Sequence, residues 1–318
     1  MRRPLLSTRA AGIFLGYVAD RWLGDPRRFH PVAAFGSAAT AWEQRLYADS
    51  RARGVAHVVF LVGAATGLGI IAERVTARAP IARTAVTAVA TWVVLGGRSL
   101  EREAAAVRVL LEQEDLPGAR RRLRSLVGRD TSALDTVEVS RAVVESVAEN
   151  TADAVVAPLL FLWGAVAGVP GLLAHRAVNT LDAMVGHRGA RYERFGWAAA
   201  RLDDLLNLPG ARLTAALTAT CAPGRAGSVL CTWWRDAEAH PSPNAGVVES
   251  SFAGALGLRL GGTNRYGART EHRPVLGDGR PPTTSDIDRT TALARRVGFG
   301  AALVSAALAT TFSRRRNG

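Results

Sequence analysis

Four charged side chains recur at every fourth position in one stretch of the chain: Arg141, Glu145, Glu149 and Asp153. Residues four apart lie on one face of a helix, and Asn150 lies one position off that line. Carboxylate and amide oxygens so placed could hold Mg²⁺, which takes a few carboxylates together with substrate phosphates. A solvated helix face with Arg141 bonded to Glu145 explains the same spacing, so spacing alone leaves both interpretations open.

A second polar group follows an apolar run. His175, Asn179 and Asp182 fall at i, i+4 and i+7, again on one helix face. Several charged residues come after them: Arg191, Arg201, Asp203 and Asp204. Arginine binds phosphate bidentately, although Arg201 and Asp204 could equally form a simple i,i+3 ion pair. Because polar residues gather at both ends of one short apolar segment, we expect the two groups to meet.

A rigid turn, His240-Pro241-Ser242-Pro243-Asn244, presents a histidine and an asparagine. The motifs of soluble enzymes are absent, since the sequence has no G-x-S-x-G, H-E-x-x-H or G-x-G-x-x-G. Every basic residue is an arginine, which excludes a Walker A lysine and a Schiff-base lysine. The two cysteines, Cys221 and Cys231, form no zinc or disulfide pattern.

Apolar segments of membrane-spanning length accompany these polar groups. A helix needs about 20 apolar residues to cross a bilayer. The sequence predicts spans near residues 55–72, 81–97, 205–221 and 297–312. The third contains Asn207 and Arg212 and could instead belong to a second hairpin. Residues 1–20 could pass for a signal peptide, but no clean cleavage site follows them, so we expect a retained first helix.

The apolar run at 154–184 is interrupted by Gly168-Val169-Pro170-Gly171, a strong turn signal. Each half has about 13 residues, too few to cross a bilayer. We expect a re-entrant helical hairpin, with one long kinked span as the alternative. Residues 240–296 are rich in glycine and proline and are expected to be mostly polar loop. Ser285-Asp286-Ile287-Asp288 matches a capping box that could start the final helix.

Composition and charge agree with a membrane protein that also has polar regions. The 318 residues are 48% hydrophobic, and the mean hydropathy is +0.09. The net charge is +13, but acids accompany the arginines of 97–150, so an anionic substrate or membrane surface is favoured over nucleic acid. Arginine is frequent in 21–54 and 97–150, rare in the link 73–80, and follows the last span at 314–316. The positive-inside rule therefore predicts a cytoplasmic C-terminus and a cytoplasmic catalytic face.

These observations predict an all-α polytopic membrane protein that forms one domain over residues 1–318. Its expected parts are transmembrane helices, a re-entrant helical hairpin at 154–184 and cytoplasmic polar loops. Nucleic acid is not an expected partner, whereas the lipid bilayer is.

The polar groups belong to longer blocks that lie in order along nearly the whole chain: residues 16–20, 24–26, 30–31, 129–132, 144–151, 153, 156–158, 179–182, 184–186, 191–192, 195–204 and 240–246. With these blocks the sequence resembles the CobD/CbiB family. Several ungapped blocks in order are more specific than any single motif. The sequence departs from the family at His187, where a tyrosine is expected, and at Asn207-Leu208-Pro209, where the family has a bulkier linker. Neither departure touches a carboxylate.

The resemblance implies a multi-pass protein of the cell membrane that acts as an adenosylcobinamide-phosphate synthase. Such an enzyme joins adenosylcobyric acid to aminopropanol phosphate, or to ethanolamine phosphate, through an amide bond with ATP as co-substrate. An acyl phosphate made from ATP would activate the carboxylate, and Mg²⁺ would orient and neutralise the phosphates. Other enzymes of the cobalamin pathway could be further partners.

The resemblance also suggests roles for individual residues, each of which is a hypothesis. The expected Mg²⁺ ligands are Asp153, Asp182, Asn150 and Asn179, together with Glu149. Substrate or phosphate binding is expected of Arg141, Arg191, Arg201, Asn244, Asp203 and Asp204. Catalysis is expected of Glu145, Glu149 and His240, with Glu145 or His240 taking a proton from the attacking ammonium group.

Two other functions stay open at this point. A corrinoid transporter would also combine polar residues with broken helices, although the sequence shows no repeated halves. A non-catalytic membrane sensor is the other alternative, and an intact stripe of carboxylates favours the enzyme over it.

Overall fold

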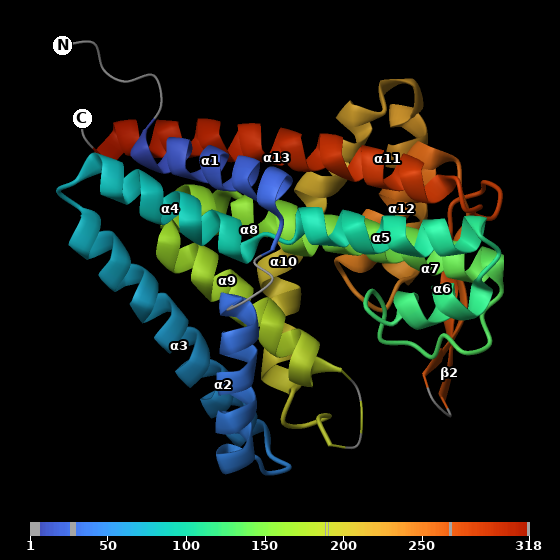
Figure 1. The fold of residues 1–318 in the computed structure, drawn as a ribbon, viewed down its shortest axis with the longest axis horizontal. Coiled ribbons are helices and arrows are strands. Elements are labelled where there is room, and N and C mark those ends of the chain that lie inside the picture. The colour runs from blue at the N-terminus through green and yellow to red at the C-terminus, as the bar shows by residue number, and fades with distance from the viewer. Residues whose placement is uncertain (1–6, 26–29, 188, 190, 267–268, 317–318) are drawn as a thin grey trace. The chain divides into compact units, whose positions relative to one another are not determined.

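The computed structural model describes residues 7–25, 30–187, 189, 191–266 and 269–316, and helices dominate it (Figure 1). The chain is 78% helical with few strands. Within these described residues, four helical stretches are long and apolar enough to cross a membrane: Arg51–Thr76, Pro80–Glu112, Thr136–Ala167 and Asp286–Ser313. The predicted all-α polytopic membrane fold is therefore confirmed.

Three of the predicted spans, 55–72, 81–97 and 297–312, lie inside these stretches. The range 205–221 lies in helix α10 (Trp197–Cys221), which also holds Pro209 and is not among the four. A span at 205–221 stays a prediction.

The chain folds into two compact units, which are described separately. The first contains Met1–Gly96, Ala157–Asn207 and Ala301–Gly318, and the second contains Gly97–Val156 and Leu208–Gly300. That the two units act together as the single domain predicted for residues 1–318 stays a prediction.

The first unit is helical throughout its described residues. Its elements are α1 (Thr8–Leu23), α2 (Pro31–Leu46), α3 (Arg51–Thr76), α4 (Pro80–Val94), α8 (Ala157–Leu159), the π-helical η2 (Phe161–Ala167), α9 (Val169–Leu181), the π-helical η3 (Asp182–Gly186), the first part of α10 and the last part of α13 (Asp286–Arg316). One side of α3 packs along α9. Its outward side keeps large apolar residues accessible, including Val59 at 65% and Leu68 at 62%, as a helix facing lipid requires.

Helices α1 and α4 approach closely because small residues meet at their interface, where Figure 1 shows them side by side. Gly12 and Gly16 on α1 face Thr87 and Thr91 on α4. A Cβ atom at Gly16 would lie 2.5 Å from the carbonyl oxygen of Ala88. This spacing of small residues is typical of helix pairs inside membranes.

The turn predicted at 168–171 lies between η2 and α9, which pack against each other. Gly168 has a φ of 72°, a conformation that suits glycine, and Pro170 lies in the first turn of α9. Glu73 accepts the backbone N–H of Val169 at 3.1 Å and pairs with Arg9 at 3.2 Å. Arg9 also donates to the carbonyl of Val166. The Arg9–Glu73 ion pair therefore connects the end of η2 with the start of α9. A re-entrant position of this hairpin in a membrane stays a prediction.

The second unit combines helices with one small sheet. Its elements are α5 (Gly97–Glu112), α6 (Leu116–Leu123), α7 (Thr136–Thr151), the π-helical η1 (Ala152–Val156), the rest of α10, the 3₁₀ turns η4 (Pro223–Arg225) and η5 (Ala237–Ala239), α11 (Ala226–Asp236), α12 (Ala245–Leu256), the antiparallel strands β1 (Leu260–Tyr266) and β2 (Arg269–Leu276), and the start of α13.

The polar loop predicted for residues 240–296 is wrong, because this range contains α12 and the β1–β2 hairpin. All twelve residues of α12 are buried. A helix that is buried on every side lacks the one-sided apolar period by which sequence patterns identify helices. The final helix begins at Asp286, within the capping sequence expected for it.

Candidate functional site

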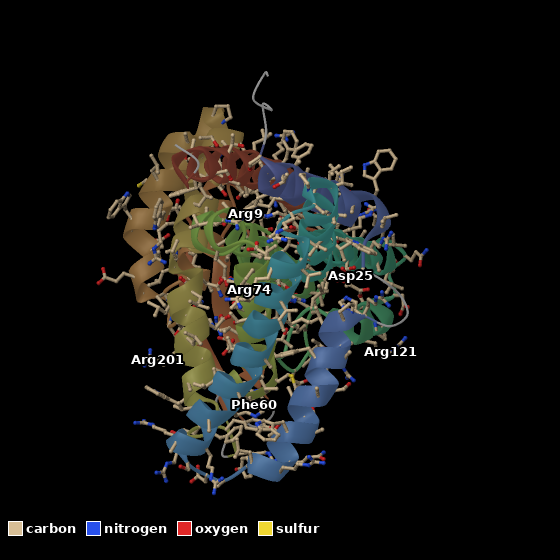
Figure 2. The ribbon with its side chains drawn as sticks, turned by 90° about the vertical axis from the view of Figure 1, so that its left-hand side faces the viewer. Arg9, Asp25, Phe60, Arg74, Arg121 and Arg201 are labelled. Atoms are coloured by element: carbon tan, nitrogen blue, oxygen red, sulfur yellow. The ribbon has the colours of Figure 1, made fainter. Side chains whose placement is uncertain are left out.

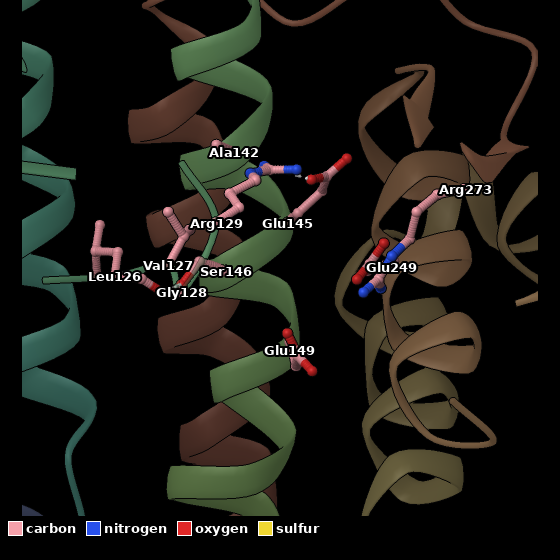
Figure 3. A pocket seen from close by; sticks show the side chains of 10 residues that line it. All are labelled: Leu126, Val127, Gly128, Arg129, Ala142, Glu145, Ser146, Glu149, Glu249 and Arg273. Carbon is pink, nitrogen blue, oxygen red and sulfur yellow. Dashed lines mark hydrogen bonds and ion pairs between the residues drawn. The ribbon is translucent and has the colours of Figure 1, made fainter. Parts of the chain in front are cut away.

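A polar pocket of about 140 Å³ lies inside the second unit (Figure 3). It is lined by Leu126, Val127, Gly128, Arg129, Ala142, Glu145, Ser146, Glu149, Glu249 and Arg273. Its charged residues come from α7, from the loop before α7, from α12 and from β2. Typical pockets for drug-sized ligands enclose roughly 300–1,000 Å³, so this one accommodates a small charged group only.

Two residues of the predicted stripe, Glu145 and Glu149, line this pocket. Helix α7 starts at a capping box, in which Asp135 accepts the backbone N–H of Glu138 and Glu138 accepts the backbone N–H of Asp135. Its next turns place Glu145 and Glu149 one above the other. Most of α7 is buried, which does not fit a solvated helix face, although the Arg141–Glu145 ion pair of that alternative is present at 4.0 Å.

Glu145 is held at both of its oxygens. Arg129 donates to one oxygen at 2.8 Å, and the backbone N–H of Gly261 donates to the other at 2.9 Å. Arg141, the partner expected from the sequence, is farther away at 4.0 Å. Gly261 follows a bulge in β1 and has a φ of 80°, and a Cβ atom there would lie 1.9 Å from the carbonyl oxygen of Pro274. Glu145 is therefore held in one position by hydrogen bonds at both of its oxygens.

Glu149 and Glu249 face the pocket from opposite sides (Figure 3). Glu149 is exposed, and its side chain borders the pocket space. Glu249 is only 4% exposed. Burial, followed by the nearby charges of Glu145 and Glu149, raises the pKa of Glu249 well above its ordinary value.

Arg273 reaches the pocket from β2 and donates to Nε2 of His240 at 2.8 Å. Nδ1 of His240 also contacts Ser242 in its own turn. It either accepts a hydrogen bond from the backbone N–H of Ser242 or donates one to the carbonyl of Ser242. A neutral ring can accept from the guanidinium of Arg273 at Nε2 while its Nδ1–H donates to the carbonyl of Ser242. His240 thus positions Arg273 at the pocket and does not itself line it.

A second polar group lies in the first unit between α9 and α10. His175 contacts Oδ1 of Asn207 at 2.9 Å, and Asn207 donates to Asp203 at 2.9 Å. Asn179 donates to the other oxygen of Asp203 at 3.5 Å. Burial, followed by the charge of Asp182, raises the pKa of Asp203 to about 7. Three residues that the sequence placed in one functional region, Asn179, Asp182 and Asp203, are thus together.

The remaining predicted residues have other surroundings. Arg191 donates to Glu43 at 3.1 Å and lies over the ring of Tyr47, and Asn244 accepts from Arg212 at 3.0 Å. The side chain of Arg201 is exposed and points outward (Figure 2). Asn150 donates to the carbonyl of Ser146.

Three further predicted residues also take part in polar or electrostatic interactions: Asp153, Asp182 and Asp204.

The expected Mg²⁺ ligands divide between the two units. Glu149, Asn150 and Asp153 belong to the second unit, whereas Asn179 and Asp182 belong to the first. Their convergence on one ion stays a prediction. Among the residues that the structure describes, no group of three or more His, Cys, Asp and Glu side chains is arranged to hold a metal ion.

Three charged residues of the pocket were not among the predicted site residues: Arg129, Glu249 and Arg273. Arg129 lies in the family block at residues 129–132, so the resemblance to the family could have identified it. Glu249 is the one charged residue in the apolar sequence of α12, and a charge in such a run indicates function or pairing. No local pattern identifies Arg273, which comes from a strand in a region expected to be loop.

Comparison with known proteins points to one family. Residues 13–294 match the family model described as CobD/Cbib protein. The chain is 52% identical over 305 residues to the cobalamin biosynthesis protein CobD of Mycobacterium tuberculosis strain H37Rv, covering 95% of this chain and 96% of that protein. It is 42% identical over 304 residues to the CobD protein of Geobacter metallireducens, covering 93% and 94%. No solved structure matches the chain.

Proposed function

The chain belongs to the CobD/CbiB family, and from this premise we propose that it is an adenosylcobinamide-phosphate synthase in the cell membrane. A role in cobalamin biosynthesis follows from the names of its relatives. The proposed reaction joins the propionate carboxylate of adenosylcobyric acid to the amine of aminopropanol phosphate or ethanolamine phosphate. The product is an amide.

The observation that carries this proposal is the polar pocket of the second unit. It combines two guanidinium groups with three carboxylates in about 140 Å³. Such a pocket suits a short substrate that has both a phosphate and an ammonium group, because arginine pairs with phosphate and glutamate pairs with ammonium. The corrin ring system is too large for this volume, so only its reacting side arm would enter.

Amide formation requires an activated carboxylate, and ATP is the proposed source of activation through an acyl phosphate. The amine nitrogen would form the C–N bond, and the C–O bond to phosphate would break with its electron pair leaving on phosphate. Arg273, positioned by His240, would stabilise phosphate charge at the pocket. Arg129 would keep the carboxylate of Glu145 in place.

Mg²⁺ is proposed to accompany ATP. Its usual protein ligands are one or two carboxylates, with the remaining positions filled by phosphates and water, so the absence of a larger acidic group is compatible with it. Glu149 and Asp153 lie four residues apart at the end of α7 and the start of η1 and would hold the ion, with Asn150 beside them. When bound, the ion would neutralise the phosphate charge. Asn179 and Asp182 stay proposed ligands as well.

A direct ligation assay tests the proposal. The protein, purified in detergent or in lipid nanodiscs, is mixed with adenosylcobyric acid, aminopropanol phosphate, ATP and Mg²⁺, and the amide is sought by mass spectrometry. We expect product that depends on each component and falls at least about 100-fold in Glu149→Gln. Glu238→Gln, which changes an exposed carboxylate in the same unit, is the matched control.

The opposite results are equally informative. Absence of product from folded protein, together with uptake of a corrinoid into vesicles, would replace the synthase with a transporter. Wild-type turnover in both Glu149→Gln and Asp182→Asn would remove these residues from the Mg²⁺ site.

A further inference from the structure

Glu249 is a buried carboxylate with an unusual environment. It lies on α12, whose twelve residues are otherwise apolar or small and are all buried. Within the described part of the chain no hydrogen bond is formed to its carboxylate, which lines the pocket, and the positive charges that act on it are those of Arg273 and Arg129. A buried carboxylate is costly unless a cation or a donor meets it. Its place on the pocket wall indicates that the missing partner comes from a ligand.

The charges around Glu249 define what that ligand must be. Two carboxylates face it from α7, Glu145 and Glu149, and two arginines oppose them, Arg129 from the loop before α7 and Arg273 from β2. Glu145 already accepts hydrogen bonds at both oxygens. Glu149 and Glu249 are therefore the carboxylates whose oxygens are available at the pocket. Glu249 is the more deeply buried of the two, and a group with several N–H donors suits it best.

Size narrows the ligand further. A pocket of about 140 Å³ with charges of both signs fits a short molecule with one cationic and one anionic end. A primary ammonium group offers three donors in a compact volume. Arg273, on the same side of the pocket as Glu249, supplies the complementary charge for the anionic end (Figure 3).

We propose that Glu249 binds the primary ammonium group of the amino phosphate substrate and accepts the proton that this group loses before it attacks. This inference rests on the proposed function for the identity of the reaction, but its binding part requires only a small amino phosphate. No family motif identified above includes Glu249.

The proton and electron changes balance within the proposed reaction. The ammonium group transfers one proton to the carboxylate of Glu249 and becomes a neutral amine. The amine lone pair forms the C–N bond to the acyl carbon, and the bond to phosphate breaks. The leaving phosphate takes the second N–H proton, and Glu249 later returns its proton to water. Burial and the two carboxylate neighbours raise the pKa of Glu249, which makes it a stronger base than an exposed glutamate.

A binding experiment tests the ammonium site without any turnover. Calorimetry in detergent compares aminopropanol phosphate with propanol phosphate, which lacks the amine. We expect the wild-type protein to prefer the amine by about 10- to 100-fold, the usual value of a charged hydrogen bond. We expect Glu249→Gln to bind both compounds alike, whereas Glu238→Gln keeps the preference. Equal preference in Glu249→Gln and wild type would overturn the proposal.

Kinetics separate this inference from the proposed function. If the wild type makes the amide, Glu249→Gln should lower kcat about 100-fold or more and raise KM for the amine, with KM for the corrinoid unchanged. Glu249→Asp should recover part of the loss. Full turnover in a folded Glu249→Gln protein would overturn the catalytic role even though the synthase stands. If the wild type makes no amide but Glu249→Gln loses the amine preference, the proposed function fails and the ammonium site remains.

Discussion

Three glutamates of one pocket carry the same functional group in three different environments. Glu145 is fixed by a guanidinium and a backbone N–H, Glu149 borders the open space, and Glu249 is buried. Hydrogen bonds to a carboxylate favour its charged form, whereas burial opposes that form. The environments therefore assign different tasks: Glu145 organises the pocket, Glu149 is available to a cation, and Glu249 is suited to take up a proton.

The ion pair of Arg129 and Glu145 yields a prediction about stability. Both side chains are buried, at 7% and 8% exposure, so removing one leaves the other charged without its partner. We expect Arg129→Leu to lower the free energy of unfolding by about 3 kcal/mol. Thermal unfolding in detergent would measure it. The double variant Arg129→Leu with Glu145→Leu should recover most of the loss, and a double variant as unstable as the single one would contradict the explanation.

Asp203 yields a prediction about pH. Its pKa is about 7 in the folded protein, raised by burial and by Asp182, and near 4 when unfolded. The folded state therefore binds more protons than the unfolded state between these values, and stability falls as pH rises from about 4 to 7. Asn207 and Asn179, which donate to Asp203, and the nearby Asp204 complete the groups that face it.

We expect Asp203→Asn to reduce this pH-dependent loss of the free energy of unfolding by on the order of 2 kcal/mol. Melting temperatures from pH 5 to pH 8 would show it. Asp49→Asn, at an exposed carboxylate of the same unit, is the control. A slope unchanged in Asp203→Asn would assign the pH dependence to another group.

At the scale of elements, the close approach of α1 and α4 depends on glycine. A Cβ atom at Gly16 would meet the backbone of Ala88 at 2.5 Å, and backbone atoms cannot move aside as a flexible side chain can. We expect Gly16→Val to separate the two helices and to lower the melting temperature and the yield of folded protein. Gly63→Val and Gly67→Val on α3, where nothing lies within 4 Å, should have little effect. Equal losses at all three positions would instead indicate a general cost of β-branched residues in helices.

At the scale of the whole molecule, arginine distribution predicts orientation. The final helix leads to Arg314-Arg315-Arg316, while the link at 73–80 between two spans holds few arginines. The positive-inside rule therefore predicts a cytoplasmic C-terminus and a link on the opposite side of the membrane. We expect a reporter that is active only in the cytoplasm to work when fused to the C-terminus. Activity of a periplasmic reporter at the same point would reverse the orientation.

The sequence by itself determined the features that depend on local order. Apolar length indicated three of the four helical stretches that could cross a membrane, and glycine with proline indicated the turn at 168–171. Spacing by four placed Glu145 and Glu149 on one face, and that face lines the pocket. These features depend only on residues that are close in sequence, so helix geometry and hydropathy are enough to predict them.

Only the tertiary structure decided which charges meet. Glu145 is hydrogen-bonded by Arg129 and by the backbone N–H of Gly261, 116 residues away, in addition to its longer ion pair with Arg141 on the same helix. His240 holds Arg273, and Glu249 enters the site from a helix that the sequence pattern missed. Such contacts arise where α12 packs against α7 and where a bulge turns β1 toward Glu145. Packing between segments far apart in the sequence has no local signature, and for that reason the residues that complete the pocket could not be predicted from their neighbours.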